Sequence, residues 1–394
     1  MTHDLARNGT GKRSMRAAWL RVHLWLGLTV GAVLSVIGLT GSALVFYTSI
    51  DEAVELPVIA PTSMSNDAPS FESVVQLLKH TWPDRTRGWR LELPSGASPL
   101  IRARYYRPAE TADKAFAPLL VWIDPRSTRI VHHAFWGNTP MTWLYDLHYT
   151  LLMGGAGRQI VGCLGLVALI SVGSGLYLWW PRRRSLRAAL TLRFNASRQR
   201  TTYDLHKIGG VYLLPFVAIL IVTGVLLDMP ETFNPMIGRT SPLFVPPTCK
   251  GVPGPRRISL DEALDAARQR FPDATPRWLE TPDGPQGCYR FRLHRQGEPG
   301  FRFPATTVWV DAYTGTVIGA RDVATQSAGD TLLGWLHPLH SGEALGLPGR
   351  IAVLVSGFAL PLLFVTGVLR WRQKNTAKRA GTSGVTIKVG ESAR

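Results

Sequence analysis

The chain has 394 residues, of which 45% are hydrophobic, so it is long enough for several membrane spans together with folded domains. Lysine and arginine outnumber aspartate and glutamate by 44 to 27, which gives a formal net charge of +17. Because this charge flanks apolar stretches and no basic soluble domain is present, the composition excludes a nucleic-acid-binding protein.

Four apolar stretches are long enough to cross a bilayer as helices of about 20 residues. They cover residues 24–47, 157–180, 208–228 and 350–370. The first is too long for the apolar region of a signal peptide and has no small-x-small cleavage site before Asp51. We therefore predict four transmembrane helices, the first of which is retained.

Basic residues crowd before the first span, between the second and third, and after the fourth. By the positive-inside rule these three regions, and with them both termini, are cytoplasmic. Much of the net charge therefore marks topology and contact with anionic membrane lipid.

The two long loops between spans then lie outside the cytoplasmic membrane. Each reads as a small α+β module, in which an amphipathic helix (residues 71–79 and 260–268) precedes alternating strands. Proline-rich stretches tether each module to its span. In chain order we predict an N-terminus (1–22), a first span (23–47), a first module (48–147), an interfacial segment with the second span (148–181), a basic loop (182–205), a third span (206–228), a second module (229–339), an interfacial segment with the fourth span (340–371) and a tail (372–394).

The chain carries a two-fold internal repeat, with two spans and one module in each copy. His23 and His206 are each followed at the same offsets by a glycine and a Thr-Gly pair, and His148 and His340 by a Gly-Arg pair, a Ser/Thr-Gly pair and a tryptophan. The equivalent positions are Gly27 and Gly210, Thr40-Gly41 and Thr223-Gly224, Gly157-Arg158 and Gly349-Arg350, Ser174-Gly175 and Thr366-Gly367, and Trp179 and Trp371.

Four histidines in repeat register predict two sites. Copies packed about a pseudo-two-fold axis along the membrane normal would bring equivalent residues face to face. His23 would then meet His206 near the cytoplasm, and His148 would meet His340 near the outer surface. The alternative for any single histidine is an amphipathic side chain at the membrane interface.

Each predicted pair offers two imidazoles with no carboxylate or thiolate. This set suits bis-histidine ligation of b-type haem better than zinc, whose closed sites take four ligands. Glycines one turn from the histidines favour a flat ligand lying close to the helix, although they also permit tight helix packing. Arg158 and Arg350 are candidate contacts for the haem propionates, with Arg21 a further candidate at the inner site, while membrane anchoring is the alternative for each.

Two points stay open in the sequence. In His337-Pro-Leu-His340 either histidine could reach the outer site, and repeat register favours His340. Cys249 and Cys288 share the second module, where an oxidising compartment would permit a disulfide, whereas Cys163 lies within a span. Covalent attachment of haem, by contrast, is excluded, because the chain has no Cys-x-x-Cys-His sequence.

These motifs resemble those of the PepSY-associated transmembrane family of bacterial inner-membrane proteins, over nearly the whole chain. The resemblance rests on His23-Leu-Trp-Leu-Gly27, Leu147-His148 through Gly157-Arg158 to Leu178-Trp-Trp-Pro181, Tyr203-Asp-Leu-His206 and Pro338-Leu-His340 through Pro348-Gly-Arg350. It implies a four-helix membrane bundle with two PepSY-like periplasmic modules. It also implies an inner-membrane ferrisiderophore reductase of the ferrioxamine-reductase type.

The resemblance implies an oxidoreductase with two b haems, which passes electrons across the membrane to a ferric siderophore. The chain has no Gly-x-Gly-x-x-Gly nucleotide motif, so an unidentified cytoplasmic reductase or a quinol would supply the electrons. The main alternative is a haem-free, membrane-anchored PepSY-like scaffold that binds or senses an envelope ligand. A transporter is disfavoured, because the spans hold no midplane acidic residues.

Overall fold

The computed structural model describes residues 3–55, 70–95, 99–181, 186–191, 197–250, 254 and 256–390, with backbone alone for 3–13, 55, 187–188 and 378–390. The predicted tether over 56–69 and the arginine-rich parts of the basic loop, 182–185 and 192–196, lie outside these ranges. The chain forms two compact units. The helical unit comprises Met1–Ala43, Ile160–Val225 and Ile351–Arg394, and the sheet unit comprises Leu44–Gln159 and Leu226–Arg350.

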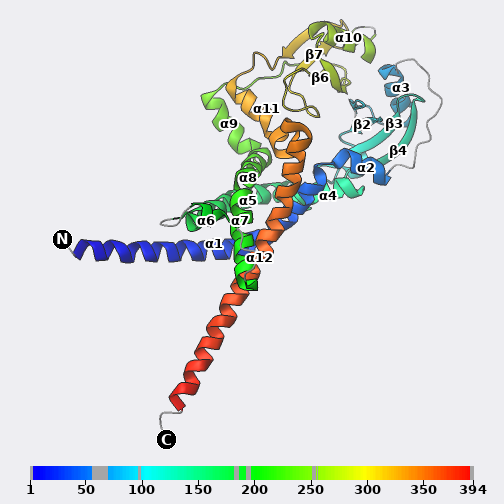
Figure 1. Cartoon of the computed structure of the whole chain (residues 1–394). Coiled ribbons are helices and arrows are strands. Elements are labelled where there is room, and N and C mark those ends of the chain that lie inside the picture. The colour runs from blue at the N-terminus through cyan, green and yellow to red at the C-terminus, as the bar shows by residue number, and fades with distance from the viewer. Residues whose placement is uncertain are drawn as a thin grey trace. The chain divides into compact units, whose positions relative to one another are not determined.

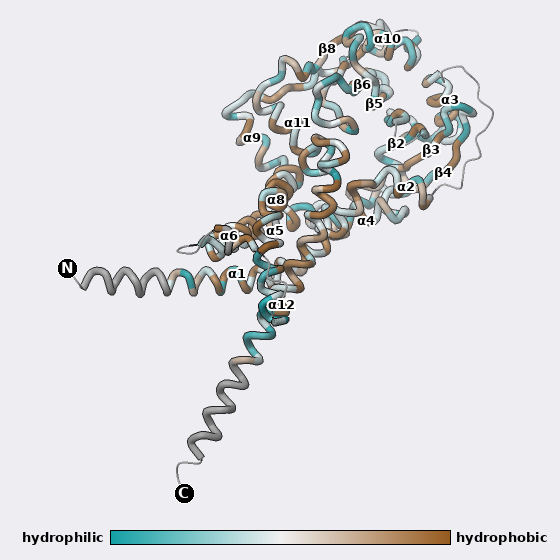
Figure 2. The backbone as a smooth tube through the Cα atoms, viewed as in Figure 1, coloured by the Kyte–Doolittle hydropathy of each residue, from teal (hydrophilic) through white to brown (hydrophobic). Residues whose placement is uncertain are grey.

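The apolar segments form helices of membrane-spanning length (Figure 2). Within the described residues, three helical stretches are long and apolar enough to cross a membrane: Ser14–Leu44, Gly154–Trp179 and Glu343–Ala377. They belong to α1 (His3–Leu44), α5 (Gly154–Trp179) and α12 (Gly346–Gly390), the last preceded by a short 3₁₀ turn, η2 (Glu343–Leu345). A short helix, α6 (Leu186–Leu190), follows α5.

The third predicted span is not one straight helix. It consists of α7 (Arg198–Tyr212) and α8 (Leu214–Asp228), which are bent by 59° at Leu213 and together qualify as a fourth span. Pro215 stands in the first turn of α8, where it has no N–H to donate and its ring excludes the carbonyl of the preceding turn. The apolar pattern gave the length of this segment, and the proline accounts for the bend.

Small residues allow close helix contacts in the helical unit. A Cβ atom on Gly357 of α12 would lie 2.4 Å from the carbonyl oxygen of Gly38 in α1 and 2.0 Å from Oγ of Ser42. The Ser42 hydroxyl donates to the carbonyl of Leu354 at 2.8 Å. Between α5 and α8, a Cβ on Gly165 would lie 2.5 Å from a methyl of Val225. Such small-residue contacts are typical of helices packed within a membrane.

The sheet unit contains a single eight-stranded antiparallel sheet (Figure 1). Its order is β4-β3-β2-β1-β5-β6-β7-β8, so the two predicted modules share one sheet through pairing of β1 with β5, where Leu91 faces Leu279. The sequence shows each module's strands but not this edge-to-edge pairing. The strands are β1 (Arg90–Glu92), β2 (Ile101–Tyr105), β3 (Leu119–Asp124), β4 (Arg129–Phe135), β5 (Thr275–Glu280), β6 (Cys288–His294), β7 (Thr307–Asp311) and β8 (Val317–Arg321).

Two helices, α3 (Phe71–Thr81) and α10 (Leu260–Arg270), cover one face of this sheet and share its hydrophobic core. Their N-termini cap one another. The Asp261 carboxylate accepts from the backbone N–H groups of Phe71 and Glu72 at 3.0 and 3.1 Å, and the Glu72 carboxylate accepts from that of Leu260 at 2.8 Å. Acidic side chains at helix N-termini are stabilising, so this reciprocal capping joins the two copies.

The sheet unit has further helices, each of which precedes or follows a span in the chain. They are α2 (Tyr47–Glu55), α4 (Pro140–Thr150), α9 (Pro230–Thr240) and α11 (Ala328–Ser341), with a 3₁₀ turn, η1 (Ala109–Thr111), between β2 and β3. Most of α4 and α11 lies within the predicted modules, and only their last residues, from His148 and His340 onward, reach the predicted interfacial segments. A break in the helix precedes the second span at 151–153, and another precedes the fourth span, beginning at Gly342.

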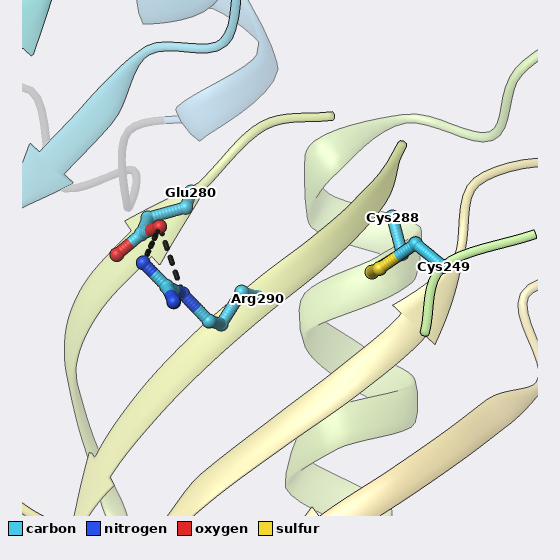
Figure 3. The surroundings of a disulfide bond; sticks show 4 residues. All are labelled: Cys249, Glu280, Cys288 and Arg290. Atoms are coloured by element: carbon cyan, nitrogen blue, oxygen red, sulfur yellow. Dashed lines mark hydrogen bonds and ion pairs between the residues drawn. A yellow bond between two sulfur atoms is a disulfide. The ribbon is translucent and has the colours of Figure 1, made fainter. Parts of the chain in front are cut away.

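The disulfide left open by the sequence is present. Cys249, in the chain that follows α9, is bonded to Cys288 at the start of β6, with Cα atoms 5.6 Å apart (Figure 3). This bond fastens the proline-rich segment to the sheet. Cys163 is the free cysteine of the described residues.

We predict that the protein purified without reductant carries one reactive thiol, Cys163, after denaturation, and three after reduction. Cys249→Ser should expose the Cys288 thiol as a second one and lower the free energy of unfolding by about 2–5 kcal/mol. Mass spectrometry after maleimide labelling measures the thiols. Three thiols in the unreduced wild type would contradict the bond.

Candidate functional site

The structure brings His23 of α1 and His206 of α7 together. Their ring centroids are 6.3 Å apart and the ring planes are inclined by 79°. Both rings are half-buried within the helical unit. This is the first of the two pairs predicted from repeat register.

The two rings are oriented by equivalent hydrogen bonds. His23 Nδ1 lies 3.1 Å from the Ser171 carbonyl oxygen and 3.0 Å from Ser174 Oγ on α5. His206 Nδ1 lies 3.1 Å from the Leu363 carbonyl oxygen and 3.0 Å from Thr366 Oγ1 on α12. Ser171 and Leu363 occupy the same position in their copies, as do Ser174 and Thr366.

These bonds assign the protonation state of the imidazoles. The Ser174 hydroxyl donates its hydrogen to the Ser171 carbonyl, and the Thr366 hydroxyl donates to Leu362 and Leu363. Each histidine therefore finds only acceptors around Nδ1, so in the neutral ring Nδ1 carries the proton. Nε2 keeps its lone pair, which is the tautomer that binds a metal, and the Nδ1 bond is the usual support of a ligating histidine.

Gly175 and Gly367 make room for the two rings. A Cβ atom on Gly175 would lie 3.0 Å from Cε1 of His23, and one on Gly367 would lie 3.5 Å from Cε1 of His206. Both glycines lie beside this pair, where their lack of a side chain admits the imidazole rings. Gly27, one turn after His23, borders open space instead, since a Cβ there would meet nothing within 4 Å.

His148 and His340 form the second pair, within the sheet unit. His148 is on α4 and His340 on α11, with ring centroids 6.1 Å apart and planes inclined by 57°. Thr139 begins α4 through a capping box with Thr142, and Ser327 caps α11 by accepting from Asp330 N–H. Sequence signals at the helix N-termini thus set the start of both histidine-bearing helices.

Each of these helices is also fastened to an edge of the sheet. Trp136, next to β4, donates from its indole N–H to Asp146 of α4 at 2.8 Å. Arg321 of β8 donates to Asp330 of α11 at 3.0 Å. Burial raises the pKa of Asp146 above its usual value, against the opposing effect of the hydrogen bonds from Trp136 and Tyr149. The sheet therefore positions both helices that carry the pair.

A close backbone crossing joins each helix to the following span. A Cβ atom on Gly157 would lie 1.7 Å from the Thr150 carbonyl oxygen, and one on Gly349 would lie 2.2 Å from that of Gly342. Gly157 and Gly349 each stand nine residues after the histidine of their copy, and Thr150 and Gly342 stand two residues after it. Only glycine fits this crossing, which explains its place in the repeat.

His337 does not take part in this pair. Its ring packs edge-on against Phe303, with centroids 4.8 Å apart. Burial and, second, the Arg302 guanidinium lower the pKa of His337 to about 4. Repeat register therefore selected the histidine that the structure places opposite His148.

The spacing of both pairs fits one metal ion held between two imidazoles. A metal–nitrogen bond is about 2 Å long and a ring nitrogen lies roughly 1 Å from its centroid, so two such rings would have centroids about 6 Å apart. The observed separations are 6.3 and 6.1 Å. No cluster of three or more histidine, cysteine or acidic side chains suited to a metal occurs among the described residues. Two facing imidazoles are also the side chains that can ligate the iron of a b-type haem.

Arg158, a predicted contact of the haem propionates, is bound to other residues of the chain. Arg158 donates from Nε to the Asp228 carbonyl at 2.9 Å and from Nη2 to Glu231 at 3.2 Å, so its guanidinium is already engaged. A wide-open groove of about 520 Å³ runs along α1 beside Arg21 and Trp25. It faces away from His23, which lies roughly 130° around the helix from its centre, so we do not assign it to this pair.

Sequence reasoning missed a set of buried arginines in the sheet unit. Arg102 and Arg104 of β2 are 7% and 9% exposed, and Arg277 of β5 is 3% exposed. Their signal was present as arginine at every second position, in Ile101-Arg-Ala-Arg-Tyr105 and Tyr289-Arg-Phe-Arg-Leu293. Arginine is rarely buried, so this alternation marks one face of the sheet as unusual.

The model of the PepSY-associated TM region matches residues 20–374, most of the chain and all four histidines. The chain belongs to this family. Family membership and the apolar helices together make it a membrane protein. A similar protein from Pseudomonas aeruginosa, described only as uncharacterized, is 25% identical over 268 residues, which is 59% of this chain and 64% of the relative. The match thus spans less than two thirds of that relative's length.

We predict that Gly157→Ala destabilises the protein by about 3 kcal/mol, because the added methyl group overlaps the Thr150 carbonyl. Gly155→Ala, two residues earlier in the same helix, is the matched control, since a Cβ there meets nothing within 4 Å. Thermal unfolding in detergent, followed by tryptophan fluorescence, measures both. Equal melting temperatures for the two variants would contradict the close crossing.

Proposed function

We propose that the protein is an inner-membrane di-haem b-type electron-transfer protein that reduces ferric siderophores in the periplasm. Its four spans would form a helix bundle, and the sheet unit would represent two joined PepSY-like modules. The observation that carries the proposal is the occurrence of two histidine pairs in repeat register, each with the ring separation expected for one metal ion. A haem-free scaffold would not require this spacing twice.

In this proposal the four histidines bind the haems, and neighbouring residues orient the histidine rings. His23 with His206, and His148 with His340, would provide the axial ligands of two b haems. Haem, when bound, supplies a one-electron carrier at each site. Ser174 and Thr366 keep the Nδ1 protons away from the ligating nitrogens and fix the planes of their rings. The Trp136–Asp146 and Arg321–Asp330 bonds would hold the second pair against the sheet.

The proposed reaction needs no acid, base or nucleophile from the chain. Ferric iron in the chelate gains one electron and becomes ferrous iron, which siderophores bind far more weakly, and the chelator is released unchanged. The electron comes from a quinol or from a separate cytoplasmic reductase. We propose that the basic flanks of the spans lie in the cytoplasm, so that electrons enter at the His23–His206 pair and leave at the His148–His340 pair.

The first test is haem content. The purified protein should contain two low-spin b haems per chain, measured by optical spectroscopy and the pyridine haemochrome assay. His23→Ala or His206→Ala should remove one haem and keep the other, and His148→Ala or His340→Ala should do the reverse. His337→Ala is the matched control and should retain both.

A wild-type protein without a Soret band after expression with ample haem would reject the redox assignment and favour the scaffold. Loss of a haem in the His337 variant but not in the His340 variant would exchange the roles of these two residues.

The second test is reduction of a ferric chelate. The haems are reduced anaerobically and ferric siderophores are added one at a time. Haem reoxidation should accompany the appearance of ferrous iron, one iron per electron, captured by a chromogenic chelator. The His340→Ala variant should keep a reducible haem but release iron much more slowly. Reoxidation by oxygen or quinone alone would make the protein a quinone-linked cytochrome.

A further inference from the structure

The eight-stranded sheet has two chemically different faces. Leu91, Ala103 and Phe291 point into the core beneath α3 and α10. Because side chains alternate along a strand, their neighbours point to the opposite face. There, the neighbours are arginine or glutamate: Arg90 and Glu92 on β1, Arg102 and Arg104 on β2, and Arg290 and Arg292 on β6.

The strand register concentrates these charges. Arg90 stands directly opposite Arg104, although like charges in facing positions repel. Glu92 faces Arg102 and Glu280 faces Arg290. Glu280 forms an ion pair with Arg290 (Figure 3) and a second one with Arg90, at 3.0 Å.

Glu92 is the focus of the remaining arginines. Its carboxylate is 3.3 Å from Arg102, 3.5 Å from Arg104 and 3.5 Å from Arg302. Burial would raise the pKa of Glu92, but these guanidinium groups, together with Arg277, lower it to about 2. One carboxylate is therefore shared among four arginines.

The face carries more positive than negative charge. Seven arginines of the described sheet unit gather here: Arg90, Arg102, Arg104, Arg277, Arg290, Arg292 and Arg302. The acidic groups in this neighbourhood are Glu92, Glu280, Glu343 and Asp51, so seven positive charges meet four negative ones, an excess of three. Burying unbalanced charge is strongly unfavourable unless an anion compensates it.

The excess of positive charge acts on Arg292, whose pKa is lowered. Burial, followed by repulsion from Arg90 and Arg290, lowers the pKa of Arg292 to about 10. The Nε atoms of Arg292, Arg104 and Arg277 are buried and have no hydrogen-bond partner among the described residues. Guanidinium groups with free N–H donors are suited to bidentate binding of carboxylates.

The arginine face borders the helices that carry the second histidine pair. The backbone N–H of Arg302 donates to Glu343 at 2.6 Å, and Glu343 is three residues after His340. The Arg302 guanidinium lies 4.8 Å from the Tyr47 ring, which packs against Tyr145 of α4. Tyr145 is three residues before His148.

We propose that this arginine face is a binding site for a carboxylate-bearing ligand. Two sources share this chemistry: the propionates of a haem held by His148 and His340, and a soluble polycarboxylate such as a carboxylate-type ferric chelate. The first source rests on the function proposed above, whereas the second does not. The site would take over the propionate role that the sequence assigned to Arg158, whose guanidinium binds Glu231.

The test uses the full-length protein in detergent and the variant Arg292→Met, which removes a charge outside any ion pair described for this face. Arg292→Lys keeps the charge. The surface variant Arg268→Met is the matched control, since the ion pair described for Arg268 is with the exposed Asp265. Without ligand, Arg292→Met should melt several degrees above the wild type, because it relieves repulsion; a purely structural arginine would show the opposite sign.

One arm measures soluble carboxylate with haem-free protein. Sodium citrate, compared with sodium chloride at matched ionic strength, should raise the melting temperature of the wild type, the Arg292→Lys variant and the surface control, but not of Arg292→Met. The other arm compares haem with haem dimethyl ester, which lacks free carboxylates. If propionates are the ligand, haem should bind the wild type at least tenfold more tightly than the ester, and Arg292→Met should bind both equally.

Either selective effect supports the site and identifies its source. If neither arm separates Arg292→Met from Arg268→Met, the proposal is overturned. If citrate stabilises the protein but the protein never binds haem, the carboxylate site is supported and the proposed electron-transfer function is rejected. Failure of the site and failure of that function are therefore distinguishable.

Discussion

Pairing of equivalent residues from the two copies of the repeat is the constraint on which the rest of the structure depends. In the sheet unit it appears as the β1–β5 pairing, with Leu91 facing Leu279, and as the exchange of caps between Glu72 and Asp261. Neither copy could satisfy these groups alone. A lone copy would leave β1 as an open sheet edge, which favours association with another strand.

The same constraint builds both histidine pairs. Each pair takes one imidazole from each copy, and His23 and His206 donate hydrogen bonds to carbonyl oxygens at equivalent positions on different helices. Symmetry therefore brings two side chains of the same chemistry together in each pair, with ring centroids 6.3 and 6.1 Å apart. This arrangement suits a flat cofactor with two axial positions, whereas a closed four-ligand zinc site would need further donors from each copy.

The sheet has one face that stabilises the fold and another that is costly to form. Apolar residues beneath α3 and α10 supply the core, whereas Arg102, Arg104 and Arg277 are buried on the opposite face. Removing guanidinium groups from water is unfavourable, and Glu92 compensates only part of their charge. Residues that reduce stability in this way often mark binding sites, where stability is exchanged for function.

The sequence by itself determined the spans, the two copies, the amphipathic helices and the four histidines in register, because these depend on local periodicity and on spacing within the chain. It also favoured His340 over His337. Tertiary structure alone decided the union of both modules in one sheet, the Cys249–Cys288 bond and the engagement of Arg158 by Glu231. Each of these features depends on contacts between residues that are distant in the chain. Hydrophobic periodicity carries no information about which distant strand, thiol or carboxylate a residue will contact.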